Sequence, residues 1–229
     1  IGLDLPNGLY FVVNSDGLSI SVQRITTGAL VDTLQIANFN TGPSTQEIVN
    51  SLAVDPINHY VYAGIWGNSL AESGVIRISY TTAGALDHTQ AYNSGSQTMF
   101  VNGSQAGSLS DLRYMDLSNN NQVLYVTDND NHYTTAPFSP KNGIYKVDLT
   151  NVAAGATLLS SQAQFPTDLS NGLLGSVTAD EEDGIIYFTT HQFNAGGAST
   201  GQDALWWMPI TGGTATKITL PAGALHYAG

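Results

Sequence analysis

Cysteine is absent from the 229-residue sequence, which excludes a disulfide framework, a zinc–thiolate site and a redox-active thiol pair. Basic side chains are scarce, since 6 lysines and arginines stand against 18 acidic residues and give a formal charge of −12. Such a chain repels phosphates, so we expect no nucleic-acid partner. Long hydrophobic runs are also missing, and none approaches the roughly 20 residues of a membrane helix, so we expect no membrane insertion.

The remaining composition favours a folded extracellular protein. Hydrophobic residues make up 42% of the chain, which is enough to build a core, and only 10% of residues are charged. Glycine, serine, threonine and asparagine are abundant. This balance is typical of secreted or cell-surface bacterial proteins, and we predict that location. The chain opens with Ile1 rather than Met, as expected for a processed product or a piece of a longer protein.

A pattern of an aspartate, a short polar turn and a β-prone run occurs four times. The aspartates recur every 51 to 64 residues, at Asp4, Asp55, Asp116 and Asp180. A carboxylate at a tight turn accepts hydrogen bonds from nearby backbone N–H groups, so we interpret all four as structural turn residues. Each following strand carries a tyrosine that we align with the others: Tyr10, Tyr62, Tyr125 and Tyr187.

Each aromatic strand is followed by an alternating run, a link that contains glycine, and a further run, as in residues 19–36. Alternation marks strands, and glycine in a short link marks a hairpin. In the second unit this pattern places the last strand at residues 86–92. No segment has sustained helical periodicity, so helices should be scarce. We therefore predict four four-stranded units, at approximately residues 1–50, 51–110, 111–172 and 173–229.

Four-stranded antiparallel units repeated along a chain predict an all-β fold, a β-propeller of about four blades. A lone unit exposes two apolar faces and two unpaired edges, and packing the units around an axis buries the faces. A β-sandwich is the rival, but it gives no reason for the fourfold register. Two forms of the propeller stay open. The chain is a closed four-bladed ring, or it supplies consecutive blades of a larger ring completed by a partner.

The repeated segment, an apolar run followed by D-x-x-[N/G] and an aromatic strand, resembles blades of NHL, YVTN and YWTD-type propellers. It is most similar to propeller tracts in very large secreted repetitive bacterial proteins of the calcium-dependent adhesin and repeats-in-toxin type. The calcium-binding nonapeptide GGxGxDxUx and a strict YWTD are both missing. The resemblance implies the propeller fold for nearly the whole chain and says little about activity.

The densest polar stretch, residues 127–133, follows the third aromatic strand. Calcium prefers six to eight oxygen ligands, and runs such as D-x-D supply several of them. We therefore predict Asp128 and Asp130 as metal ligands and calcium as the one candidate cofactor, with a solvated turn as the alternative. The sequence contains no H-x-x-x-H or H-E-x-x-H arrangement and no G-x-S-x-G elbow, so it predicts no catalytic residue.

Three further residues are predicted to bind a ligand. His191 follows the fourth aromatic strand where Asp128 follows the third, so the two loops belong to the same face of the ring, and His132 lies in the Asp128 loop. Trp66 ends the second aromatic strand, where an exposed ring suits stacking on a sugar. For the histidines the alternative is that they are surface loop residues one blade apart, and for Trp66 it is packing between blades.

The functional prediction is a non-catalytic extracellular propeller module that acts as a structural, assembly or ligand-binding element. Its expected partners are other domains or copies of the same protein, in a homo-oligomer or filament. The alternative is a propeller hydrolase or lyase with a calcium-assisted site on one face.

Overall fold

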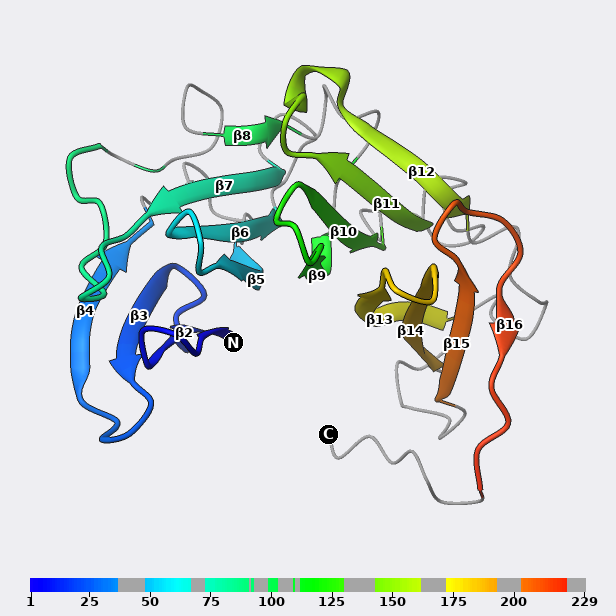
Figure 1. Cartoon of the computed structure of the whole chain (residues 1–229), viewed down its shortest axis with the longest axis horizontal. Helices are drawn as coiled ribbons and strands as arrows, with labels where there is room; N and C mark the ends of the chain where they lie inside the picture. Colours follow the sequence, from blue (N-terminus) through cyan, green and yellow to red (C-terminus); the bar gives the residue numbers. More distant parts are fainter. Residues whose placement is uncertain are drawn as a thin grey trace, which may run out of the picture.

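The computed structural model describes residues 1–36, 48–66, 73–90, 92, 99–102, 109, 112–129, 143–161, 172–192 and 203–221. It contains four antiparallel sheets of four strands, each hydrogen-bonded in chain order (Figure 1). The first sheet is β1 (Gly2–Asp4), β2 (Leu9–Val13), β3 (Ser19–Arg24) and β4 (Leu30–Gln35). The second is β5 (Ile48–Asp55), β6 (Tyr60–Trp66), β7 (Gly74–Ser79) and β8 (Met99–Asn102). The third is β9 (Leu112–Leu117), β10 (Val123–Asp128), β11 (Gly143–Asp148) and β12 (Ala156–Ser161). The fourth is β13 (Gly172–Asp180), β14 (Ile185–Gln192), β15 (Ala204–Pro209) and β16 (Thr216–Lys217).

The sheets follow one another around a central region, with β1, β5, β9 and β13 innermost (Figure 1). Contacts between neighbouring innermost strands join β1 to β5, β5 to β9 and β9 to β13. This radial arrangement confirms the predicted all-β propeller. The four sheets form an open arc, with the first sheet at one end and the fourth sheet at the other (Figure 1). A single 3-10 turn, Val152–Ala154, is the helical element among the described residues, none of which forms a helix long and apolar enough to span a membrane.

Alternate residues of each sheet face its two neighbours, because successive side chains of a strand point to opposite faces. The first interface contains Phe11 and Val22 packed with Ile76 and Ile78 of the second sheet. The second interface joins Tyr62 and Val75 to the third sheet, and the third joins Tyr125 and Ile144 to the fourth. A middle sheet is therefore apolar on both faces, as stacked repeats require.

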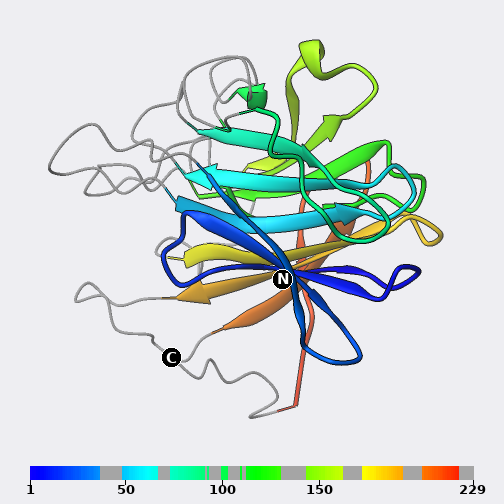
Figure 2. The same ribbon diagram turned by 90° about the vertical axis from the view of Figure 1, so that its left-hand side faces the viewer.

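The turns between the first two strands of each sheet gather on one side of the array, at the right of Figure 2. Each contains one residue in the left-handed region, with φ between 56° and 67°: Gly8, His59, Asn121 and Gly184. Asp4 accepts a hydrogen bond from the Asn7 N–H (3.0 Å), and Asp55 does the same for Asn58 (2.9 Å). Asp180 accepts from the Asp183 N–H at 3.1 Å.

The third turn differs from the expectation. Here the Ser118 hydroxyl accepts from the Gln122 and Val123 N–H groups, at 3.0 and 2.9 Å. Asp116 lies two residues earlier, opposite Tyr125 in the strand pair, and its carboxylate points to the fourth sheet instead. The turn is as long as the others, because Ser118 bonds to Val123 at the separation at which Asp4 pairs with Leu9, so the serine occupies the position that aspartate holds elsewhere.

The alignment of Tyr10 with the other three tyrosines is wrong. Asp4 pairs with Leu9 just as Asp55 pairs with Tyr60 and Asp180 with Ile185, so the residue equivalent to Tyr62 and Tyr187 is Phe11. A shift of one residue moves a side chain to the other face of a sheet. Tyr10 therefore lies on the face of the first sheet that points away from the second.

The last strand of the second sheet is β8, not residues 86–92 as the repeat predicted. Leu86 forms only an isolated bridge with Tyr80. The Leu86 N–H donates instead to Asp32 Oδ2 of the first sheet at 2.8 Å. The Asp87 carboxylate accepts from the N–H and hydroxyl of Thr89, which turns the chain away from β7.

Candidate functional site

A hollow of about 470 Å³ lies on the inner side of the array, where three innermost strands meet. Its walls come from residues 1–3, 52–54 and 115–117, and the third turn closes one end with Ser118, Asn119 and Asn121. Ligand pockets in proteins commonly span about 300–1,000 Å³ and combine apolar walls with a few polar groups. We refer to this feature as the channel-side hollow.

The walls of the channel-side hollow combine apolar side chains with a lining surface that is mainly polar. Leu52 and Met115 are buried, whereas Leu3 remains 52% exposed and forms part of the entrance. The exposed Asn119 and half-buried Asn121 lie at the polar end. An asparagine amide both donates and accepts, so this end suits uncharged hydrogen-bonding groups.

The carboxylates beside the hollow make contacts that hold the third and fourth sheets together. Asp116 Oδ2 accepts from the Thr178 hydroxyl (2.9 Å) and from the Ala179 N–H (2.8 Å). Glu181 accepts from the Asn119 N–H at 3.0 Å and from the Tyr125 hydroxyl at 3.3 Å. Burial, together with the Glu181 carboxylate, raises the pKa of Tyr125 to about 12. The phenol is therefore a protonated donor at neutral pH.

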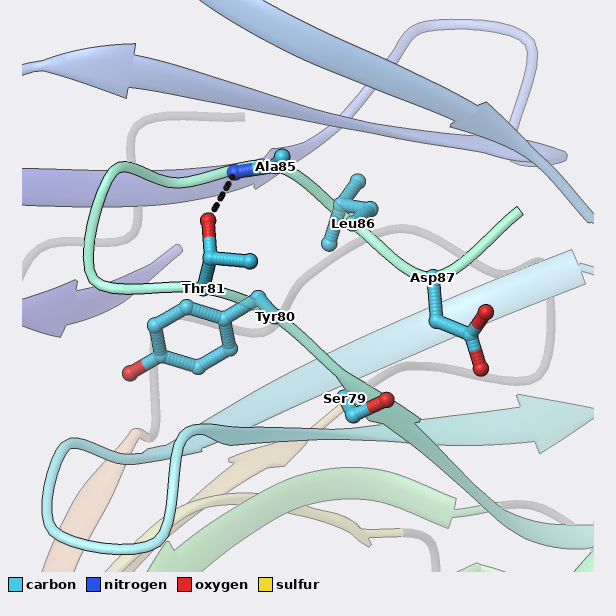
Figure 3. Close-up of a pocket in the computed structure, with 6 residues that line it drawn as sticks. All are labelled: Ser79, Tyr80, Thr81, Ala85, Leu86 and Asp87. Atoms are coloured by element: carbon cyan, nitrogen blue, oxygen red, sulfur yellow. Dashed lines mark hydrogen bonds between the residues drawn. The ribbon is translucent and has the colours of Figure 1, made fainter. Parts of the chain in front are cut away.

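A smaller hollow, of about 270 Å³, follows the end of β7 and is lined by residues 79–81 and 85–87 (Figure 3). The Ala85 N–H donates to the Thr81 hydroxyl and closes the loop around it. The Tyr80 hydroxyl donates to Asp4 Oδ2 at 2.8 Å and to the Asp55 carbonyl at 3.3 Å. Burial and the hydrogen bond to Asp4 raise the pKa of Tyr80 far above its usual value. This tyrosine thus joins the turns of the first two sheets.

The predicted calcium ligands are only partly described. Asp128 is buried at the end of β10, and Asp130 lies outside the described residues. The neighbouring Asn129 donates to the Leu174 carbonyl at 2.8 Å and accepts from the Leu174 N–H at 2.7 Å. The described residues contain no group of three or more His, Asp or Glu side chains arranged to hold a metal. Calcium binding stays a prediction.

Of the predicted ligand-binding residues, the two that the structure describes, Trp66 and His191, do not line either hollow. His191 lies with its Nδ1 3.3 Å from Asp203 Oδ1, and both side chains are mostly buried. Trp66 is half-buried at the end of β6, and His132 lies outside the described residues. The structure therefore does not bring Trp66 or His191 to the channel-side hollow.

Two features escaped the sequence reasoning. The pairing of His191 with Asp203 follows from strand register, because Thr190 lies opposite Ala204 and the next pair outward is 191 and 203. The alternation of residues predicts the two strands, whereas their register is seen in the structure. The channel-side hollow had no motif, because its walls are ordinary residues of the innermost strands and of the third turn.

Comparisons with known proteins bear on the fold. No protein-family model and no curated protein matches the chain. Hydrazine synthase of Kuenenia stuttgartiensis is similar in structure, with a TM-score of 0.56, 12% identity, and coverage of 96% of this chain and 53% of that one. A Lactobacillus plantarum protein is also similar in structure, with a TM-score of 0.48, 14% identity, and coverage of 93% of this chain and 68% of that one. A putative exo-beta-1,3-galactanase of Bifidobacterium bifidum s17 (TM-score 0.46, 10% identity) is covered over 62% and matches 89% of this chain.

These identities establish a likeness of fold alone. This chain spans about half the length of the hydrazine synthase chain it matches. The likeness of fold to the hydrazine synthase chain agrees with the radial sheets, and no family match assigns the chain to the NHL, YVTN or adhesin type.

Proposed function

We propose that this propeller chain is a non-catalytic ligand-binding module of a secreted or cell-surface bacterial protein, with its ligand in the channel-side hollow. The observation that carries the proposal is the hollow itself, a cleft at the inner strands with a mainly polar lining, apolar side chains on its walls and an amide-lined end. An uncharged ligand with one apolar side matches these walls. The acidic, cysteine-free composition supports the extracellular location.

The nearby carboxylates support binding over catalysis. Asp116 and Glu181 accept hydrogen bonds from neighbouring strands and turns, which holds the rim of the hollow in place. A rigid, preformed site loses little entropy when it binds a ligand. The proposed role for these residues is to fix the shape of the site.

A thermal-shift screen with short uncharged peptides and oligosaccharides tests this function. A ligand at 100 times its Kd stabilises the folded chain by about 2.7 kcal/mol, which appears as a higher Tm. Leu3→Arg at the entrance should abolish the shift. Leu30→Arg is the matched control, because Leu30 is 63% exposed on β4 and lies outside the hollow. No shift with any ligand, or a shift that survives Leu3→Arg, contradicts the proposal.

A calcium-assisted hydrolase or lyase is the second candidate, favoured by the His191–Asp203 pair. A carboxylate beside an imidazole orients it for proton transfer. This candidate predicts that millimolar calcium raises the Tm and that His191→Gln removes hydrolytic or lyase activity. An unchanged Tm counts against calcium at Asp128 and Asp130.

A further inference from the structure

The channel-side hollow is bordered by strand edges that have no partner strand. In an antiparallel pair, successive residues alternate between bonding to the partner strand and pointing their N–H and C=O groups the other way. The innermost strands β1, β5 and β9 each pair with one strand of their own sheet, so the other edge of each faces the inside of the array (Figure 1). The main chain along this edge can therefore bond to a ligand.

The strand register shows which residues present their main chain on this edge. The Ser118 N–H donates to the Val123 carbonyl, so Ser118 and Asp116 bond to β10, whereas Met115 and Leu117 point to the free edge of β9. The same alternation assigns three residues of β1 and β5 to their free edges: Leu3, Leu52 and Val54. We call these five the free-edge residues, and all of them line the channel-side hollow.

The main-chain groups of the free-edge residues lack partners on that edge. Within the part of the chain that the structure describes, no hydrogen bond from another strand, turn or side chain reaches them there. Leu52 and Met115 are at most 9% exposed. A buried N–H or C=O group without a partner costs about as much free energy as a lost hydrogen bond. A ligand that supplies these bonds removes that cost.

The innermost strand of the fourth sheet shows the opposite arrangement. The Ala179 N–H, at the position equivalent to Val54, donates to the Asp116 carboxylate at 2.8 Å. Asn129 bonds to both main-chain groups of Leu174. Side chains of the third sheet thus satisfy the free edge of β13. The edges around the channel-side hollow have no such side-chain partners among the described residues, which leaves them to an external one.

The spacing of the free-edge residues matches an extended peptide. Leu52 and Val54 are two residues apart in one strand, so their main-chain groups repeat at about 6.5–7 Å, the repeat of alternate residues in any β-strand. A peptide of about four residues can form this ladder, whereas an oligosaccharide lacks the alternating N–H and C=O groups. The net charge of −12 disfavours an acidic peptide.

We propose that the ligand of the channel-side hollow is an extended, uncharged peptide segment that adds a strand to the free edge of β5. This inference rests on the proposed ligand-binding function and names the class of its ligand. In such strand addition the main chain provides the affinity, and the neighbouring side chains select alternate side chains of the peptide. Leu3 at the entrance and the buried Leu52 and Met115 favour a peptide with an apolar residue.

A panel of acetylated and amidated pentapeptides, each with one valine or leucine among serines and threonines, tests the ligand class. Several of them should raise the Tm of the 229-residue chain, because recognition is mainly by the main chain. Two ester analogues of the best binder then replace either the odd-numbered or the even-numbered N–H groups by oxygen. One edge of the peptide faces β5, so one analogue should bind at least about tenfold more weakly and the other as the parent does. Equal affinities of the two analogues overturn the proposal.

A proline substitution tests the edge from the protein side. Val54→Pro removes a free-edge N–H and keeps the ladder with β6, and it should weaken peptide binding about tenfold. Gln35→Pro is the matched control, because the Ile36 N–H donates to the Leu18 carbonyl and the Gln35 N–H therefore points away from β3. Peptide binding that is equal in these two variants overturns the proposal. Where Val54→Pro does not fold, the ester analogues decide.

The same screen separates this inference from the proposed function. Binding of oligosaccharides but of no peptide, lost in Leu3→Arg, overturns the peptide ligand and leaves the ligand-binding function intact. No shift with either class of ligand overturns both. Peptide binding with the unequal ester analogues and the loss in Val54→Pro is the result we expect.

Discussion

The interface between the first and second sheets is held together differently from the one between the third and fourth. In the first, apolar side chains fill the middle, and the polar links are made by side chains at the ends of strands, notably Tyr80 to Asp4. In the other, Asn129, Thr127 and Asp116 bond directly to the backbone of β13. Innermost strands have one edge without a partner in their own sheet. Side-chain bonds from the neighbouring sheet satisfy that edge for β13.

The difference is that β1 has three residues and β13 has nine. A long innermost strand exposes more unpaired backbone groups, and each one that is buried without a partner costs free energy. The third sheet supplies those partners. We therefore expect hydrogen bonds to matter more at the third interface and apolar packing to dominate at the first.

The largest effect should come from the core of the third interface. Trp206 is fully buried, and its indole N–H donates to the Thr190 hydroxyl at 2.9 Å. Trp206→Ala should lower the free energy of unfolding by about 3–5 kcal/mol in urea titrations. Trp207→Ala is the control, because Trp207 lies on the opposite face of β15 and is only partly buried, so it should cost much less. Equal losses would contradict the assignment of the two faces.

Removal of the amide that bonds to β13 should have the next largest effect. Asn129→Ala leaves the buried Leu174 N–H and carbonyl without their side-chain partner, so unfolding should become easier by about 2–3 kcal/mol. Asn151 is exposed and makes no capping hydrogen bond, so Asn151→Ala should change the stability by less than about 0.5 kcal/mol. Similar stabilities of the two variants would show that β13 does not depend on this link.

The polar link of the first interface should contribute less. Tyr80→Phe keeps the ring packed on Phe11 and removes only the hydroxyl, so the expected loss is about 1–2 kcal/mol. Tyr114→Phe, at an exposed position, should be neutral. A loss from Tyr80→Phe larger than that from Asn129→Ala would reverse the comparison of the two interfaces.

The dependence of stability on alkaline pH tests whether Tyr62 and Tyr125 are buried. Burial raises the pKa of Tyr62 and of Tyr125 to about 12 in the folded chain, while the unfolded phenol keeps a pKa of about 10. Their contribution to stability is complete below pH 10 and is lost as the pH rises to about 12. Equilibrium unfolding measured from pH 8 to 12 should show this decline. A flat profile would contradict the burial of these phenols.

The smallest effect is expected at acid pH. The N–H of Leu18 and the hydroxyl of Ser19 lower the pKa of Asp16, and the hydroxyl and N–H of Thr89 lower that of Asp87. A lowered pKa adds stability above the unfolded value of about 3.9, and that stability is lost as the pH falls through the folded value. Asp87→Asn should therefore reduce the dependence of the Tm on pH below about pH 4. An unchanged dependence would exclude Asp87 as a contributor.

Much of the fold could be predicted from the sequence, because the repeated turns and strand alternation are local signals. The four sheets and the order of strands follow from them. The two faces of the first sheet could not be assigned by aligning the repeat sequences. Tyr10 and Phe11 are neighbours, and a shift of one residue in the alignment exchanges their faces. The role of Asp116 depended on the strand register, which places Ser118 rather than Asp116 at the turn, and the place of β8 depended on contacts between Leu86 and the first sheet.

The candidate site was harder to predict. A polar cluster such as residues 127–133 has the composition of a binding site and is predicted as one from the sequence. The channel-side hollow is instead built from residues such as Leu52 and Met115, whose types are equally common in a hydrophobic core. Only the arrangement of three innermost strands distinguishes them. The His191–Asp203 pair needed strand register, which the repeat supplied only for the strands and not for the loop between them.

Hydroxyl-radical footprinting read by mass spectrometry tests most directly whether sheets pack around an axis with alternate residues facing opposite neighbours. Trp207 and Tyr187 are partly buried and should be modified more readily than Trp206, Tyr62 and Tyr125, which are buried. Equal modification of the adjacent Trp206 and Trp207, or of Tyr62 and Tyr187, would contradict the packing of the sheets described above.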